Sequence, residues 1–437
     1  MSIMQNNIGN LKLRLTVMSY LVYAVWGSYL CSLGVYLANI GMGADIGAFF
    51  AVQGIVSLFM PALVGIVADR WIPAQKCLGI CQLLAALFMA AAGYIGYIHG
   101  NGLKFSQLFP MYAISVAFFM PTIALSNSVS YNALTKSGLD TVKVFPNIRV
   151  FGTVGFVISM WVVDLTGFKD TYMQLFVSAA WSVVLGLYAF TLPNCPVTHK
   201  RKSDSFTEMF GLQAFMLFRK RKMALFFIFS FLLGMCLQVT NGFASPFLAS
   251  FGYDESLADS FAVKHNVILT SLSQVSETLC ILLIPFFLKR YGIKTVMLIS
   301  MLAWVLRFGL FGMGNPQMPG LILIVLSMVF YGIAFDFFNI SGSLFVDRET
   351  DESIRSSAQG VFMLMTNGLG ATIGSFCAQS IVNTYTHSAS KVVMGEERFF
   401  TIGEWSTCWY IFAGFALIVA VMFAILFKNG NNTKTSE

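Results

Sequence analysis

The sequence is a succession of apolar runs of membrane-spanning length, and this pattern constrains the fold more than any other feature. A helix needs ~20 apolar residues to cross the hydrocarbon core of a bilayer. Of the 437 residues, 57% are hydrophobic and 11% are charged, a composition that excludes a soluble enzyme. A transmembrane β-barrel is disfavoured, because its strands alternate polar and apolar residues over short segments. We therefore predict an all-α polytopic membrane protein.

Gly, Pro, Asn and charged residues divide the apolar runs into twelve spans, in two groups of six. The expected spans are 14–37, 45–68, 76–98, 107–130, 146–167, 171–192, 223–248, 264–287, 293–314, 320–345, 356–384 and 405–427. Between the groups, the basic stretch contains an amphipathic segment at Phe206–Phe218, typical of a helix that lies on a membrane surface. The predicted parts are a six-helix half over 1–192, a cytoplasmic linker over 193–222 and a second six-helix half over 223–437.

The 27 Lys and Arg residues orient these spans, since basic residues concentrate in cytoplasmic loops. With both termini in the cytoplasm, twenty of them lie inside, five lie outside, and Arg149 and Arg307 fall within spans. This asymmetry predicts a multi-pass protein with cytoplasmic termini. It also accounts for the net charge of +7 without nucleic acid as a partner.

Two loops at corresponding places in the halves carry similar charges. Gly65, Asp69 and Arg70 lie in Gly-Ile-Val-Ala-Asp-Arg after the second span, and Lys289-Arg-Tyr-Gly-Ile-Lys294 follows the eighth. Either loop alone is compatible with ordinary cytoplasmic loop composition. Together with the six-plus-six arrangement, they resemble the major facilitator superfamily. The resemblance implies two halves that rock about a site at mid-membrane, with Gly65, Asp69 and Arg70 in a conformational-switch motif.

Ionisable side chains inside a span are costly, so each one is a candidate for function. Glu277 lies in the middle of the eighth span, Asp336 lies deep in the tenth, and Arg149 lies at the start of the fifth. For Arg307, in the ninth span, we favour a structural or snorkelling role. Asp164 lies near the outer end of the fifth span, where we expect it to reach water.

Helical spacing gathers polar and aromatic side chains into four stripes, because residues three or four positions apart share a helix face. The stripes are Arg149, Thr153 and Phe156; Gln238 and Asn241; Gln274 and Glu277; and Tyr331, Phe335, Asp336 and Asn339. Amides and carboxylates suit ligand hydroxyls, and rings suit a flat face. The stripes therefore predict a site for a neutral, polyhydroxylated ligand with a flat face. Trp26, Gln53, Asn127 and Asn367 are further candidates for lining a cavity, but nothing in the sequence selects them.

Each stripe also has a structural interpretation. The amides of the seventh span could bond neighbouring helices, as amides do in membrane bundles. The two rings of the tenth span could be packing residues, and either carboxylate could pair with Arg149.

A carboxylate in a low-dielectric interior can bind and release protons near neutral pH, which is the chemistry of a proton-coupled carrier. One proton moving down ~100 mV supplies ~2.3 kcal/mol. That energy sustains a concentration gradient of roughly tens-fold. The hypothesis requires at least one of Glu277 and Asp336 to titrate.

Several long segments resemble the nucleoside:proton symporter family, within the major facilitator superfamily, along nearly the whole chain. They are Phe59–Asp69, Ile148–Phe156, Phe226–Ser230, Ser273–Thr278, Ile284–Lys294, Ala334–Gly342 and Ser357–Gly360. The resemblance implies inward, proton-driven transport of nucleosides such as uridine, cytidine or adenosine. It further implies a protein that functions as a monomer in a bacterial cytoplasmic membrane, with H+ as the coupling ion and with no cofactor or metal.

The family's nucleoside pocket falls on ten positions of this sequence. They are Arg149, Thr153, Phe156, Gln238, Asn241, Gln274, Glu277, Tyr331, Phe335 and Asp336. On this basis the ribose hydroxyls meet the amides and Glu277, and the base stacks near Phe156 or Phe335. Asp336 is the first choice for the coupling carboxylate and Glu277 the second. The chain departs from the family pattern in an insert at 386–400, which we expect to be an outer loop.

Three other functions stay open at this point. A sugar or oligosaccharide proton symporter would use similar amides and acids. A channel would place a ring of like charges along its pore, which the two halves do not offer. An intramembrane enzyme lacks support, because no nucleophile motif or metal-ligand spacing occurs, and Cys77 and Cys81, one helical turn apart, read as small buried hydrophobes.

Overall fold

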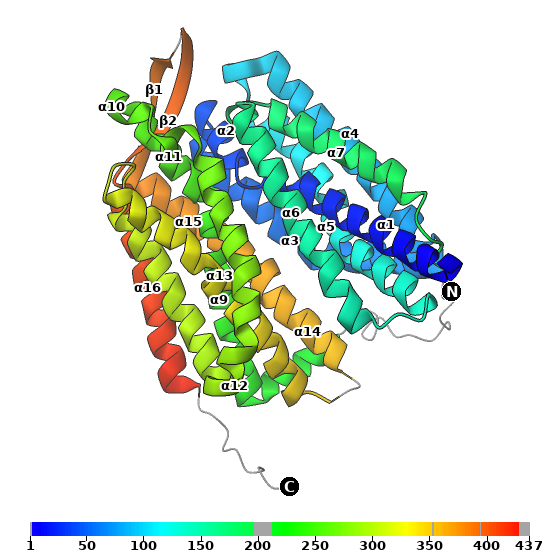
Figure 1. Ribbon diagram of the computed structural model, residues 1–437. Helices are drawn as coiled ribbons and strands as arrows, with labels where there is room; N and C mark the ends of the chain where they lie inside the picture. Colours follow the sequence, from blue (N-terminus) through cyan, green and yellow to red (C-terminus); the bar gives the residue numbers. More distant parts are fainter. Residues whose placement is uncertain (1, 196–211, 352–353, 394, 428–437) are drawn as a thin grey trace. The chain divides into compact units, whose positions relative to one another are not determined.

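A computed structural model describes residues 2–195, 212–351, 354–393 and 395–427 of the chain (Figure 1). The helices of the first half are α1 (Ser2–Gly27), α2 (Leu33–Asn39), α3 (Ile46–Arg70), α4 (Ala74–His99), α5 (Phe105–Lys136), α6 (Thr141–Leu165) and α7 (Met173–Ala189). Those of the second half are α9 (Arg221–Ser250), α10 (Glu255–Ala258), α11 (Phe261–Lys264), α12 (Asn266–Met313), α13 (Gly320–Glu349), α14 (Arg355–Met363), α15 (Ala371–Tyr385) and α16 (Trp405–Leu426).

The predicted all-α membrane fold is confirmed. In the described ranges, nine helices are long and apolar enough to cross a membrane, and α7 is a shorter apolar helix. One of the nine, α12, contains both the eighth and the ninth expected spans. They meet at Gly292, whose φ of 76° lies in the left-handed region that favours glycine. The described helices are consistent with twelve spans.

The first expected span is broken rather than continuous. The chain leaves the helix at Gly27 and re-enters one at Leu33. In between, the Ser28 hydroxyl donates to the Ala24 carbonyl at 2.7 Å, and the Ser32 hydroxyl donates to the Gln174 amide oxygen at 2.8 Å. The Ser32 hydroxyl thus ties the interruption to the start of α7.

Two segments between spans differ from simple loops. The insert expected to be an outer loop forms an antiparallel hairpin of β1 (Thr386–Val393) and β2 (Glu396–Gly403). The first part of the amphipathic segment predicted at Phe206–Phe218, residues 206–211, lies outside the described residues. The rest of it belongs to the 3-10 helix η4 (Leu212–Arg219).

Contacts within the chain define two units. Unit 1 comprises Met1–Lys202, Thr240–Ser271 and Ser375–Gly403, and unit 2 comprises Ser203–Val239, Leu272–Gly374 and Glu404–Glu437. Unit 1 therefore combines the first half with the ends of α9, α12 and α15 and with the hairpin. The predicted boundaries at 192 and 222 concern the order of the chain and stay a prediction.

Small residues let helices of unit 1 pack closely. α1 packs along α6 (Figure 1). A Cβ added at Gly27 would overlap the Phe156 carbonyl oxygen, and one at Gly155 would overlap the Tyr20 carbonyl oxygen. The two backbones thus approach closely, as small residues permit in membrane bundles. This packing holds α6, with its predicted polar stripe, at a fixed position against α1.

In unit 2, hydroxyl groups tie α12 to α13. The Ser300 hydroxyl donates to the Ala334 carbonyl at 2.5 Å, and the Ser276 hydroxyl donates to the Val329 carbonyl. A Cβ at Gly332 would lie 2.6 Å from the Ser276 carbonyl oxygen, so glycine allows the contact between the helices. Both parts of α12 are therefore fixed against the helix that carries Tyr331, Phe335 and Asp336.

Candidate functional site

The polar stripe on α6 lies within an aromatic cluster of unit 1. The Arg149 guanidinium lies 3.9 Å from the centroid of the Tyr23 ring, an arrangement that favours a cation. Phe156 is buried, and its ring meets the Trp26 ring edge-on at 6.1 Å. Arg149 and Thr153 are half-buried. The cluster therefore holds a cation, a hydroxyl and a ring on one helix face.

Behind this cluster, Gln53 links two aromatic side chains. Gln53 is buried, accepts from the Trp26 indole N–H at 3.3 Å, and donates to the Tyr112 hydroxyl at 3.0 Å. Trp26 and Gln53 were candidates that nothing in the sequence selects, and Tyr23 was not predicted. The spacing of Tyr23 and Trp26, three apart on one helix, is a signal that could have found both rings.

The predicted stripe on α13 contains a stacked pair of rings in unit 2. The Tyr331 and Phe335 rings are nearly parallel, 3° apart, with centroids separated by 5.7 Å. Trp304 meets the Tyr331 ring at 89° and 6.0 Å. Asp336 directly follows Phe335 in the helix and is 5% exposed. The same turn of α13 thus carries a buried acid and an ordered pair of rings.

The amides and the second carboxylate are distributed over α9 and α12. Gln238 is buried, whereas Asn241, Gln274 and Glu277 are half-buried. The Gln274 amide oxygen is buried and has no hydrogen-bond partner among the residues that the structure describes. Such an acceptor is costly unless another group donates to it, so this position is suited to a ligand hydroxyl.

Arg307 has the structural role that its sequence position favours. It is 2% exposed and donates to the Ser327 carbonyl at 2.8 Å and to the Ser273 hydroxyl at 3.3 Å. Its guanidinium lies 4.5 Å from the centroid of the Tyr331 ring. Arg307 therefore supports, from α12, one of the predicted site residues on α13.

The ten predicted positions belong to both units. Unit 1 contains Arg149, Thr153, Phe156 and Asn241, and unit 2 contains Gln238, Gln274, Glu277, Tyr331, Phe335 and Asp336. In unit 2, Tyr331 and Phe335 stack on each other along α13. Arg149 and Phe156 contact neighbouring aromatic residues of α1 instead of each other.

The predicted switch motif lies at the end of α3, which finishes at Arg70. Gly65 has open space where a Cβ would be, and the side chain of Asp69 lies outside the described residues. Cys77 and Cys81 are buried. Within the described parts of the chain, no group of three or more His, Cys, Asp or Glu residues could hold a metal ion.

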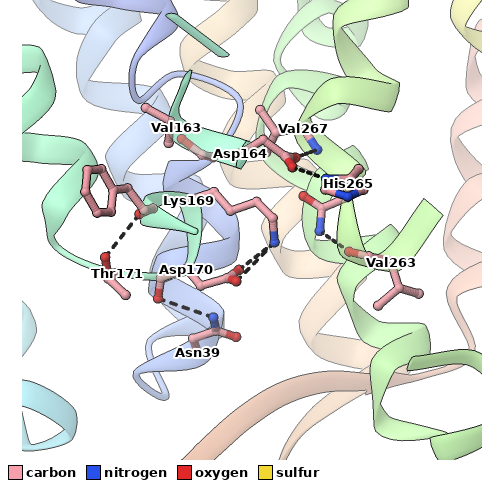
Figure 2. Close-up of polar contacts among 12 residues, drawn as sticks. Asn39, Val163, Asp164, Lys169, Asp170, Thr171, Val263, His265 and Val267 are labelled. Carbon is pink, nitrogen blue, oxygen red and sulfur yellow. Dashed lines mark hydrogen bonds and ion pairs between the residues drawn. The ribbon is translucent and has the colours of Figure 1, made fainter. Parts of the chain in front are cut away.

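Asp164 does not lie in water as its sequence position suggested. It is 3% exposed, and its carboxylate accepts from the backbone N–H groups of Val267 and Ile268 at 3.0 and 3.1 Å. His265 Nδ1 lies 2.6 Å from the other carboxylate oxygen (Figure 2). The first N–H groups of α12 have no partner within their own helix, and an acid at that end satisfies them.

Further contacts at the same end of unit 1 join the two halves of the sequence. The Trp161 indole donates to the Ser271 hydroxyl at 2.9 Å. Gln379 of α15 accepts from the Gly47 N–H at 2.5 Å and donates to the Gly43 carbonyl at 3.0 Å. We call the contacts of Trp161 and Gln379, together with Asp164 and its partners, the closed end. It joins the first half directly to the ends of α12 and α15.

Comparisons with known proteins identify the family. The chain matches the family model "Nucleoside H+ symporter" over residues 9–432. It is 47% identical over 423 residues to the nucleoside permease NupG of Escherichia coli (strain K12), and 46% identical over 423 residues to the xanthosine permease of the same organism. Each alignment covers 96% of both chains.

Solved structures agree with the fold. The crystal structure of the nucleoside transporter NupG matches with a TM-score of 0.84 and 45% identity, over 96% of this chain and 100% of that one. A D-xylose-proton symporter matches with a TM-score of 0.68 but only 13% identity, over 96% of this chain and 98% of that one, so it shares the fold alone. The chain belongs to the nucleoside H+ symporter family, as its sequence segments predicted.

Proposed function

We propose that this protein carries nucleosides into the cell together with protons by alternating access. The observation that carries this proposal is the arrangement on α13, within a chain that matches the symporter family over residues 9–432. There, the buried Asp336 directly follows Phe335, whose ring stacks on that of Tyr331. A flat ligand and a proton can thus be bound within one turn of helix.

For the nucleoside, we assign the ribose hydroxyls to the amides and to Glu277. Four residues of α9 and α12 supply these groups: Gln238, Asn241, Gln274 and Glu277. The buried and unpartnered acceptor oxygen of Gln274, among the described residues, supports this assignment. The base would stack near Phe156 or Phe335. Arg149, Thr153 and Tyr331 would add polar contacts, and the proposed substrates include uridine, cytidine and adenosine.

For the proton, Asp336 is the first candidate and Glu277 the second. Burial in a low-dielectric interior disfavours the charged form of a carboxylate, so protonation removes the cost of moving a charge as the protein changes state. Asp336 is the more buried of the two. This difference supports the order of the assignment.

The closed end would have to open for a nucleoside to enter. We propose that this end faces the outside and that both termini are cytoplasmic, because the distribution of Lys and Arg favours this orientation. The motif of Gly65, Asp69 and Arg70 would act at the opposite side as a conformational switch. The proposed location is the bacterial inner membrane, with a monomer as the working unit.

Uptake of labelled uridine into proteoliposomes with an imposed pH gradient tests the function. We expect uphill accumulation that disappears when the gradient is collapsed. Asp336→Asn should bind uridine but lose gradient-driven accumulation, and Glu277→Gln is compared with it. If both variants accumulate uridine as the wild type does, the proton assignment is wrong.

Two further measurements separate this function from the alternatives. Excess xylose or lactose should not displace labelled uridine, whereas cytidine and adenosine should. Displacement by the sugars alone would favour a sugar symporter. Flux that does not saturate and never runs uphill would indicate a channel.

A further inference from the structure

Unit 2 contains a cavity whose lining includes Phe335 but none of the other nine predicted positions. It is lined by parts of α9, α12 and α13 and by the π-helical turn η6 (Leu364–Gly370). Its lining combines aromatic rings with polar side chains, as in sites that bind small molecules.

One wall of the cavity is aromatic. Phe335 and Trp304 both line it. One face of Phe335 is stacked on Tyr331, and Tyr331 is held by the edge of Trp304 and by Arg307. Nucleic-acid bases stack on such rings with about 1–3 kcal/mol per base. The wall is thus a rigid platform for a flat heteroaromatic group.

Two amides are the polar groups of the cavity that remain available. Asn339 follows Phe335 by four residues on α13, is half-buried, and makes no side-chain hydrogen bond within the described ranges. Asn367 lies on η6, is half-buried, and contacts only a weak acceptor, with its amide nitrogen 3.5 Å from Met363 Sδ. In contrast, the Thr366 hydroxyl donates to the Phe362 carbonyl at 3.0 Å.

The backbone of η6 is pressed against α9 at two glycines. A Cβ at Gly234 would overlap the Thr366 carbonyl oxygen, and a Cβ at Gly370 would lie 2.6 Å from the Phe231 carbonyl oxygen. π-helical turns are rare and occur often at functional sites. The contact with α9 therefore fixes the wide turn that presents Asn367 to the cavity.

We infer that this cavity is the nucleobase subsite, in which Phe335 stacks on the base while Asn339 and Asn367 hydrogen bond with its edge. An amide offers both a donor and an acceptor, so it can match the edges of uracil, cytosine and adenine. The inference rests on the proposed function. It adds two residues that read the base, as distinct from those assigned to the ribose.

The test compares uridine with analogues that are altered at the edge of the base. Uridine is paired with 3-methyluridine, in which a methyl group replaces the N3–H donor, and with the 2-pyrimidinone riboside, which lacks both the 4-oxygen and the N3–H donor. Affinities are measured on the purified full-length protein for the wild type, Asn339→Leu and Asn367→Leu. Asn132→Leu is the control, because Asn132 is exposed on α5 and donates to the Ser128 carbonyl of its own helix.

A base-reading amide predicts a specific pattern. The wild type and Asn132→Leu should prefer uridine over at least one analogue about 5-fold or more, a ratio typical of one lost hydrogen bond. That ratio should fall to near one in Asn339→Leu or Asn367→Leu. If a leucine variant does not give a monodisperse protein, the same affinity ratios are measured on the serine variant at that position.

The result that overturns the inference is distinct from failure of the proposed function. If uridine binds and both asparagine variants keep the wild-type ratios, the subsite is wrong while nucleoside transport stands. If the wild type binds no nucleoside at all, the proposed function fails, and the inference with it.

Discussion

Asp164→Asn is expected to weaken the closed end of unit 1. The wild-type carboxylate accepts from two backbone N–H groups at 3.0 and 3.1 Å and lies 2.6 Å from His265. Hydrogen bonds to a charged group contribute about 1.5–3 kcal/mol each. Asparagine keeps the shape but is neutral, so its oxygen accepts more weakly from the two N–H groups, and the ion pair with a protonated His265 is lost.

The substitution should lower the stability of the closed state by about 2–3 kcal/mol, relative to a state in which these groups reach water. This loss corresponds to an open population about 30- to 150-fold larger. A reporter cysteine at Ser375, which is 1% exposed on α15 where its backbone lies against Gly47, measures that population in a protein whose native cysteines are replaced. The rate of labelling by a membrane-impermeant maleimide should rise by the same factor.

The control is Asp140→Asn, which removes the same charge at the other end of α6. Asp140 is half exposed and pairs with Lys143 at 3.7 Å. Exposed pairs of this kind contribute little, so labelling should not change. Equal labelling rates in Asp164→Asn and Asp140→Asn would refute the role assigned to the closed end.

Two other substitutions probe the supports of the site. Arg307→Lys keeps a positive charge but cannot both stack on Tyr331 and bond the Ser327 carbonyl. The Kd for uridine should therefore rise about 5- to 30-fold, from about 1–2 kcal/mol of lost interaction. Arg290→Lys, at an exposed position, is the control, and an unchanged Kd in Arg307→Lys would contradict this role. Gly155→Ala places a methyl group against the Tyr20 carbonyl and should destabilise the protein by about 1–3 kcal/mol, seen as a lower Tm. Gly309→Ala, where a Cβ meets open space, should leave the Tm equal or higher, and a similar fall in both variants would argue against close packing of α1 on α6.

The candidate site could be anticipated from sequence wherever its signal was local. The Tyr331 and Phe335 rings stack because a spacing of four residues places them on one helix face, which depends only on helix geometry. The depth of Asp336 followed equally from its place within an apolar run. The roles of these residues in binding and coupling stay predictions.

Other features depended on partners distant in the chain. Asp164 was expected in water, but it is covered by the start of α12, about a hundred residues later. Asn367 could not be selected, because nothing in a single sequence predicts a π-helical turn or the glycines of α9 that fix it. The hairpin β1–β2 was likewise hidden in a segment that sequence analysis treated as an outer loop.

The sequence by itself determined that the chain crosses a membrane many times, which helix faces are polar, and to which family it belongs. These properties follow from hydropathy, from the period of the helix and from long local motifs. Tertiary structure alone decided which polar groups are buried together, which carboxylate closes one end of unit 1, and where a cavity adjoins the aromatic wall. The physical reason is that burial and hydrogen bonding depend on pairs of helices brought together by packing, and the hydropathy of one helix does not specify its neighbour.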